Sequence, residues 1–206
     1  IIGLQEVTPE EYEWLIECLG NDYEIYGDFR GSIGNTNEAC PILVKKQAGD
    51  VICSKTFSIS SNIDKIGKKY FGAFFPRIAT YIHFVDDFDE YSIINTHVDN
   101  SRIIQKKTFD MNGPIEQILE KYGLDNQIIM GDMNTDLKGP LKQFCYRNFL
   151  EDAALPLGNT YKPLNMALDH ILYTDDSNMN TCNTRLFSND GSDHSLIMTE
   201  IHTKRS

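Results

Sequence analysis

The sequence has 206 residues, of which 41% are hydrophobic and 24% charged, the balance of an ordinary globular protein with a substantial core. No apolar run approaches the roughly 20 residues that a membrane-spanning helix requires. The formal net charge of −11 disfavours a protein that grips long nucleic acid, because such proteins usually present a basic face to the phosphates.

A strand and a well-marked helix open the chain. Residues 1–7 are apolar enough for a buried strand. Thr8 then provides a helix cap, Pro9 suits the first helical position, and Glu11 can reach back to the cap. Gly20 ends this predicted helix.

Beyond Gly20, strands outnumber helices. Further strands are predicted at residues 41–46, 51–59, 77–85, 91–96, 127–131, 168–174 and 196–201. Longer helices are predicted at residues 101–122 and 141–150, and a surface loop at residues 60–76. This order favours an α+β or layered sandwich fold over a regular alternation of strands and helices. The absence of repeats and linkers predicts a single domain over residues 1–206.

The cysteines indicate a reducing environment. They are odd in number and widely scattered: Cys18, Cys40, Cys53, Cys145 and Cys182. Because no pair has the close spacing of a zinc site or a redox motif, we expect reduced thiols and a cytoplasmic location.

Polar side chains gather where the predicted strands end. They are Glu6, Glu38, His97, Asp99, Asp132, Asn134, Asp169, His170, Asp193 and His194. Each alone is more often a turn residue, a helix cap or a structural histidine than a functional group. Together they supply hard oxygen ligands, which suit magnesium or manganese, and histidine–carboxylate pairs, which suit proton transfer. A cation and a positioned base are what hydrolysis of a phosphate ester requires.

Seven short blocks carry a family resemblance. In chain order they are GLQEV, NEACPIL, FPRIATYI, INTHVDN, IIMGDMNTD, LDHILY and GSDHS. Each is weak alone, but in this order, from Leu4 to His194, they resemble the endonuclease/exonuclease/phosphatase superfamily. The resemblance implies a four-layer α/β/β/α sandwich of two mixed, mainly antiparallel sheets with helices on the outer faces.

The resemblance also implies a metal and water site. Glu6 would be the central metal ligand, and Asp193 would support the metal side. Asp132 would orient or help deprotonate the attacking water, and Asn134 would hydrogen-bond the phosphate. The implied cofactor is Mg²⁺, with Mn²⁺ as the alternative.

The histidines have implied roles as well. His194 would be the general acid/base and phosphate contact, oriented by Asp169. His97 would be the second active-site histidine, supported by Glu38. Arg77 could reach the site, although a structural ion pair at the sheet rim is an equal alternative.

The sequence departs from the family pattern at several positions. Relatives begin with a strand that carries an asparagine, so we expect a first strand upstream of Ile1. Ala167 stands where many relatives have arginine, and Cys40 where a polar residue is usual. Val7 and Thr8 replace the lysine typical of abasic-site endonucleases, which makes that branch less favoured.

These features predict a magnesium-dependent phosphoric ester hydrolase, a phosphodiesterase, phosphatase or nuclease that works by in-line attack of water. The alternatives are a non-catalytic ligand-binding module on the same fold and an α+β domain with coincidental motifs. A small phosphodiester, a phosphorylated headgroup or a nucleic-acid end would each fit as substrate. The segment KIGKK, residues 65–69, is the densest basic patch, and a solvated loop is its more ordinary meaning. The oligomeric state is open.

Overall fold

The computed structural model describes residues 1–175, 179–188 and 191–203. Its strands are β1 (Ile2–Gly3), β2 (Tyr23–Tyr26), β3 (Ile42–Lys45), β4 (Asp50–Ser58), β5 (Ile78–Val85), β6 (Glu90–His97), β7 (Asn126–Asp132), β8 (Leu150–Asp152), β9 (Asp169–Thr174), β10 (Met179–Phe187) and β11 (Leu196–Thr203). Its α-helices are α1 (Pro9–Leu19), α2 (Arg102–Thr108), α3 (Pro114–Tyr122) and α4 (Gly139–Arg147), with short 3-10 turns η1 (Gly34–Thr36) and η2 (Leu155–Leu157).

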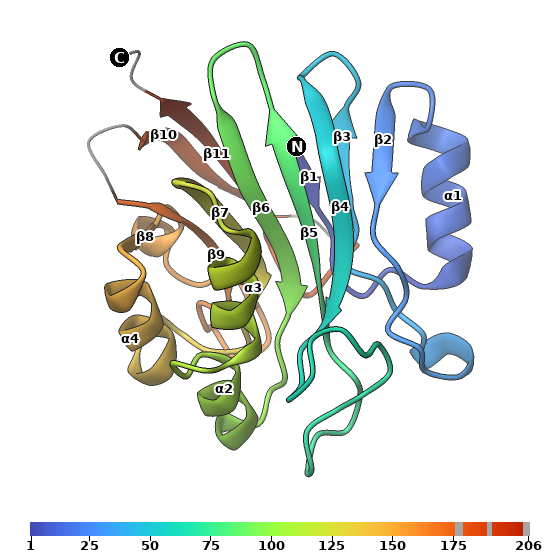
Figure 1. Ribbon diagram of the computed structural model, residues 1–206, viewed down its shortest axis with the longest axis vertical. Coiled ribbons are helices and arrows are strands. Elements are labelled where there is room, and N and C mark those ends of the chain that lie inside the picture. Colours follow the sequence, from blue (N-terminus) through green and yellow to red (C-terminus); the bar gives the residue numbers. More distant parts are fainter. Residues whose placement is uncertain (176–178, 189–190, 204–206) are drawn as a thin grey trace.

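These elements form four layers (Figure 1). One inner layer is a six-stranded sheet of order β4-β5-β6-β7-β9-β8, in which only β6 and β7 run parallel. The other inner layer consists of a three-stranded sheet, β1-β3-β2, and a two-stranded sheet, β10-β11. Helix α1 lies outside the three-stranded sheet, and α2, α3 and α4 lie outside the six-stranded one (Figure 1). The predicted α/β/β/α sandwich is therefore confirmed.

Three apolar clusters hold the layers together. Strand β5 contributes to two of these clusters, one on each face. Tyr81 faces the outer helices, whereas Ile82 and Phe84 face the opposite sheet. The outer cluster joins the six-stranded sheet to α3 and α4, and a second cluster fills the space between the sheets. A third packs Leu15 of α1 on Leu43 of β3. Burying these faces removes apolar area from water at roughly 25 cal/mol per Å².

Strand register brings three of the predicted site residues into one row. His97 at the end of β6 pairs with Asp132 at the end of β7, and Asp132 pairs in turn with Asp169 at the start of β9. Gly131 allows the strands to meet closely here, because a Cβ at its φ of +141° would lie 1.9 Å from the Thr96 carbonyl oxygen. The sheet thus presents a histidine and two carboxylates at one edge.

Some predicted elements need correction. The helix predicted over residues 101–122 is two helices, because Gly113 and Pro114 start α3 as a separate helix. The strand predicted over residues 1–7 is only β1, although the helix after it begins as predicted, with Thr8 and Glu11 forming a capping box. Strands β2, β8 and β10 were not predicted. The alternation of β10 is masked by a register shift between Cys182 and Arg185.

Within the described residues, the helices are too short or too polar to cross a membrane.

Candidate active site

Loops from the second inner layer meet the β6–β7–β9 row at the lower end of the sheets in Figure 1. Glu6 follows β1, Glu38 precedes β3, and His194 precedes β11. Two groups of possible ligand atoms result, each with its atoms within 4.8 Å of one another: Glu6, Glu38 and His97, and Asp132, Asp169 and His194. Asp132 also lies 3.5 Å from His97, so the two groups form one site.

His194 is held by a chain of hydrogen bonds. Its Nδ1 lies 2.7 Å from Oδ2 of Asp169, and the same oxygen accepts a 2.5 Å hydrogen bond from the Thr160 hydroxyl. Thr160 Oγ1 in turn accepts from the backbone N–H groups of Leu168 and Asp169. The Tyr161 ring lies against the imidazole, with ring centroids 4.8 Å apart. Ring orientation is therefore fixed from two sides, as proton transfer requires.

The surroundings of His194 favour its charged form. Partial burial acts to lower its pKa, but the hydrogen bond to Asp169 and the charges of Asp169, Asp132 and Asp193 outweigh it and raise the pKa above the ordinary value. The Nε2 atom lies 3.8 Å from Oδ2 of Asp132, across the row.

Asp132 is the most buried carboxylate of the site. Burial and the neighbouring charge of Asp169 raise its pKa to about 6, against a hydrogen bond from the backbone N–H of Asn134. Such a carboxylate can take up a proton near neutral pH, which a general base must do.

His97 differs from His194 in charge. Burial, followed by the positive charges of Arg77 and Arg30, holds the pKa of His97 well below its usual value, so the ring is neutral. The Asn134 amide donates to Nε2 at 3.0 Å, which leaves the proton on Nδ1. That Nδ1 is buried without a hydrogen-bond partner and faces Oε1 of Glu6 at 3.6 Å.

Asn134 holds this arrangement in place. Its side-chain nitrogen also donates to the Val98 carbonyl, so both amide hydrogens are used within the protein. Its backbone is left-handed, with φ 50°, and so is that of Glu6, with φ 60°. A non-glycine residue in this conformation costs about 1–3 kcal/mol and is typical of functional sites.

The site fits a divalent cation on the side of Glu6. The Glu6 side chain is 68% exposed and has His97 as its one ion-pair partner among the described residues. Burial and the negative charge of Glu6 both raise the pKa of Glu38. In the same way, burial and the charge of Asp169 raise the pKa of Asp132. Crowded carboxylates of this kind are relieved by a cation, and carboxylate oxygens are the ligands that Mg²⁺ and Mn²⁺ prefer. Asp193 is exposed and belongs to neither ligand group, so its support of a metal stays a prediction.

Two arginines lie beside the carboxylates. Arg30 is buried and pairs with Glu38 at 2.9 Å, and its guanidinium lies 4.7 Å from the centroid of the Phe75 ring. Arg77 is half-buried and its Nε has no hydrogen-bond partner; in the described part of the chain it makes no ion pair. The structural ion pair considered for Arg77 is thus not seen, and its charge acts on His97 and Glu38 instead.

The remaining predicted residues have structural contacts. Asp99 accepts from the backbone N–H of Ser101, before α2. His170 is buried and pairs with Asp152 at 2.7 Å, away from the row. Thr160 and Arg30 are site residues that the sequence did not indicate, because a threonine or arginine in a loop carries no pattern of its own.

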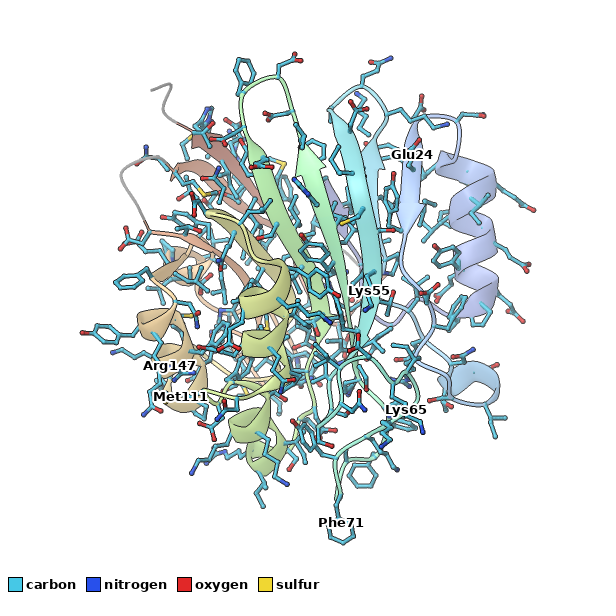
Figure 2. The ribbon with its side chains drawn as sticks, viewed as in Figure 1. Glu24, Lys55, Lys65, Phe71, Met111 and Arg147 are labelled. Carbon is cyan, nitrogen blue, oxygen red and sulfur yellow. The ribbon has the colours of Figure 1, made fainter. Side chains whose placement is uncertain are left out.

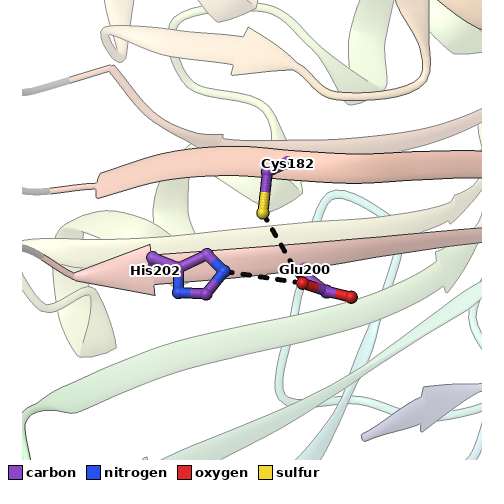
Figure 3. A group of neighbouring side chains, drawn as sticks. All are labelled: Cys182, Glu200 and His202. Atoms are coloured by element: carbon purple, nitrogen blue, oxygen red, sulfur yellow. Dashed lines mark hydrogen bonds and ion pairs between the residues drawn. The ribbon is translucent and has the colours of Figure 1, made fainter.

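A third group of possible ligands lies elsewhere, on the exposed face of β10 and β11 (Figure 3). Glu200 is 3.6 Å from both Cys182 and His202, and it also accepts from Asn183. Cys182 and Glu200 are direct cross-strand partners, so ordinary pairing contacts account for this group.

Comparison with known proteins identifies the family. The profile of the Endonuclease/Exonuclease/phosphatase family matches residues 1–194. The chain belongs to this family. A search of curated protein sequences found no match.

Solved structures share the fold. An endonuclease/exonuclease/phosphatase from Bacteroides vulgatus matches with a TM-score of 0.85 and 21% identity, over 98% of this chain and 84% of that one. A mannosyl-6-phosphatase from Bacteroides thetaiotaomicron matches with a TM-score of 0.78 and 20% identity, over 97% and 84%. The TDP2 protein of D. rerio, solved with a single-strand DNA product, matches with a TM-score of 0.72 and 13% identity, over 98% and 85%.

Proposed function

We propose that this phosphoesterase-family protein is a magnesium-dependent hydrolase of phosphate esters that uses one-step, in-line attack by water. The observation that carries the proposal is the row of His97, Asp132 and Asp169 on adjacent strand ends, with His194 held over it by Asp169. A base, an oriented acid and exposed carboxylate ligands at one edge match the needs of this reaction.

Each residue has a role in the proposed step. Asp132 orients the water and takes its proton as the new O–P bond forms. His194 gives a proton to the ester oxygen as the old P–O bond breaks, and Asp169 keeps its ring in position. The protonated Nδ1 of His97 offers a hydrogen-bond donor to a phosphoryl oxygen beside Glu6.

Glu6 would hold the cation, with Asp193 in support. A bound Mg²⁺ would neutralise charge on the phosphoryl oxygens. The positive charge of Arg77 lies next to the same carboxylates and would favour an anionic substrate. The strands and hydrogen bonds described above fix the positions of the other site residues.

The substrate class is open between a small phosphodiester, a phosphorylated headgroup and a nucleic-acid end. The fold relatives include a phosphatase and a protein solved with a DNA product, so a phosphodiesterase, phosphatase or nuclease activity would each have precedent. The net charge of −11 favours a small ester or a chain end over a long duplex. We further propose that the chain forms a single domain. We also propose a cytoplasmic location, which the scattered free cysteines support.

The test is hydrolysis of bis(p-nitrophenyl) phosphate and p-nitrophenyl phosphate, each with Mg²⁺, Mn²⁺ or chelator. We expect turnover that requires the cation and that His194→Ala abolishes, while His202→Ala, a change at an exposed histidine on β11, leaves it intact. Preference between the two esters separates diesterase from monoesterase. Absence of turnover on these and on natural phosphate esters, from a folded protein that binds the cation, would favour a ligand-binding module.

A further inference from the structure

The loop between β4 and β5, residues 59–77, projects from the same rim as the site. Figure 2 shows Phe71 at its tip, beyond the rest of the fold. The Phe71 side chain is 99% exposed and that of Phe74 is 77% exposed. Single exposed apolar residues are common on proteins, but two phenylalanines on one projecting tip form a local apolar surface.

The loop is basic although the chain is acidic. The loop contains Lys65, Lys68, Lys69 and Arg77 against one acidic residue, Asp64, in a chain of net charge −11. Lys107 of α2 adds a further cation, 5.3 Å from the centroid of the Tyr70 ring. Lys69, which donates to the Phe74 carbonyl, and Lys107 therefore place positive charge beside the apolar tip.

A second loop extends this surface. Ile33, in the turn of residues 31–37, is 92% exposed, and Ile66 of the basic loop is 37% exposed. The two loops touch, because a Cβ at Gly31 would lie 3.4 Å from the Gly67 Cα, and Arg30 lies over the Phe75 ring. The two touching loops therefore expose aliphatic as well as aromatic side chains.

The base of the loop lies beside the active site. The backbone N–H of Ile59 donates to the Arg77 carbonyl at 2.7 Å, which closes the loop, and Phe75 of the loop lies against Arg30, the ion-pair partner of Glu38. Lys69 donates to the Phe74 carbonyl at 3.0 Å, which links the two sides of the tip. A molecule bound at the tip would therefore lie near the edge that carries His97, Asp132 and His194.

We propose that this loop docks the protein on an anionic lipid membrane and that the substrate is a phosphorylated lipid headgroup. Phenylalanines enter the boundary between headgroups and acyl chains, and lysines around them are attracted to acidic lipids. A single-stranded nucleic acid could also stack on phenylalanines. The isoleucines favour lipid, because aliphatic side chains enter the acyl boundary of a membrane but do not stack on bases. The substrate assignment rests on the proposed function, whereas the docking does not.

The docking test is co-sedimentation of the whole protein with phosphatidylcholine vesicles that contain either no or about one third phosphatidylserine. We expect binding to the acidic vesicles that weakens at high salt. The double substitution Phe71→Ser, Phe74→Ser should reduce the partition coefficient about tenfold or more, and Lys65→Gln with Lys68→Gln should reduce it further at low salt. Phe88→Ser is the matched control, since Phe88 is 64% exposed but lies in the turn after β5, at the other end of that strand.

Three results would overturn the docking: no binding to acidic vesicles, equal binding by the Phe71/Phe74 variant, or equal loss in the Phe88 control. Tight binding of a single-stranded oligonucleotide that the Phe71/Phe74 variant alone loses, without vesicle binding, would assign the loop to nucleic acid instead.

Hydrolysis of the soluble nitrophenyl esters should be unchanged in the loop variants. Release of phosphate or headgroup from phosphoinositide-containing vesicles, lost in the Phe71/Phe74 variant, would support the substrate class. Vesicle binding by a protein that hydrolyses no ester would retain the docking and contradict the proposed function.

Discussion

Two histidine–carboxylate pairs lie next to each other in this protein, since Asp169 and His170 are consecutive residues of β9. In both pairs an Nδ1 atom lies 2.7 Å from an Oδ2 atom, His194 with Asp169 and His170 with Asp152. The pairs differ in surroundings. The His194 side chain is 26% exposed and its Nε2 faces Asp132, whereas that of His170 is 2% exposed and its Nε2 lies 2.8 Å from the Thr135 carbonyl.

The surroundings of each ring explain why His194, and not His170, is the proposed proton-transfer group. His170 has both nitrogens committed to acceptors inside the fold, so its proton cannot leave without loss of a buried hydrogen bond. His194 has one nitrogen fixed by Asp169 and the other directed to the edge where His97 and Asp132 lie. The neighbouring residue does not separate them, because each histidine follows an aspartate; only the family resemblance singled out His194.

The largest expected effect is on catalysis. His194→Gln should lower kcat by about 10²–10⁴-fold, because a positioned acid/base is lost. Its thermal unfolding should stay close to wild type, since the ring is at the rim and partly exposed. Kinetics on a nitrophenyl ester and a thermal melt of the same sample check both parts. Unchanged kcat would remove His194 from the chemistry.

The second effect is on stability. His170→Asn should destabilise the fold by about 3–5 kcal/mol, because it leaves the Asp152 carboxylate buried without its partner. Urea unfolding gives the free energy, and activity per folded molecule should fall far less than in His194→Gln. The double variant Asp152→Asn, His170→Asn should recover part of the loss. Near wild-type stability of His170→Asn would mean that this pair does not hold the fold.

A smaller effect is expected from the support behind Asp169. Thr160→Val should cost about 1–3 kcal/mol, because the backbone N–H groups of Leu168 and Asp169 lose their acceptor. It should also lower kcat more than it changes KM, since the orientation of Asp169 is loosened. Thr160→Ser keeps the hydroxyl and should restore both. Failure of serine to restore kcat would show that the hydroxyl is not what positions Asp169.

The smallest effect is a pH dependence of stability. Burial works to lower the pKa of His170, but its bonds to Asp152 and the Thr135 carbonyl raise the pKa above the ordinary value. The charged pair therefore contributes its full stability below about pH 6.5, the pKa in the unfolded chain, and the contribution is lost as pH rises through the folded-state pKa. The difference in unfolding free energy between wild type and Asp152→Asn should therefore shrink as pH rises from about 6.5 through the folded-state pKa of His170. His202→Asn, an exposed control, should show no such trend.

The layers and most site residues could be predicted from sequence. Apolar-rich runs mark β5 and β6, which are buried on both faces, and the polar residues after the apolar runs mark the rim. Glu6, His97, Asp132, Asp169 and His194 do meet there. Register in β6, β7 and β9 aligns His97, Asp132 and Asp169, and the loops after β1 and before β11 bring Glu6 and His194 to them. The assignment of their chemical roles stays a prediction.

Other features depend on contacts that no local pattern reveals. Thr160 supports Asp169 only because its loop returns to the start of β9, and Arg30 meets Glu38 across a turn. The helix predicted over residues 101–122 is interrupted because Gly113 and Pro114 begin α3 as a separate helix. Strand β8 has only three residues, too few to show the two-residue alternation of a strand.

The proposed function depends most on Glu6, which would hold the cation that hydrolysis requires. The most direct measurement is a Mn²⁺ titration of wild type and Glu6→Gln, with bound ion followed by loss of the free-Mn²⁺ paramagnetic resonance signal and turnover recorded on the same samples. We expect wild-type turnover to rise in step with bound Mn²⁺, and we expect Glu6→Gln to lose both while remaining folded. Full turnover after chelation, or unchanged Mn²⁺ binding in Glu6→Gln, would rule out this role of Glu6.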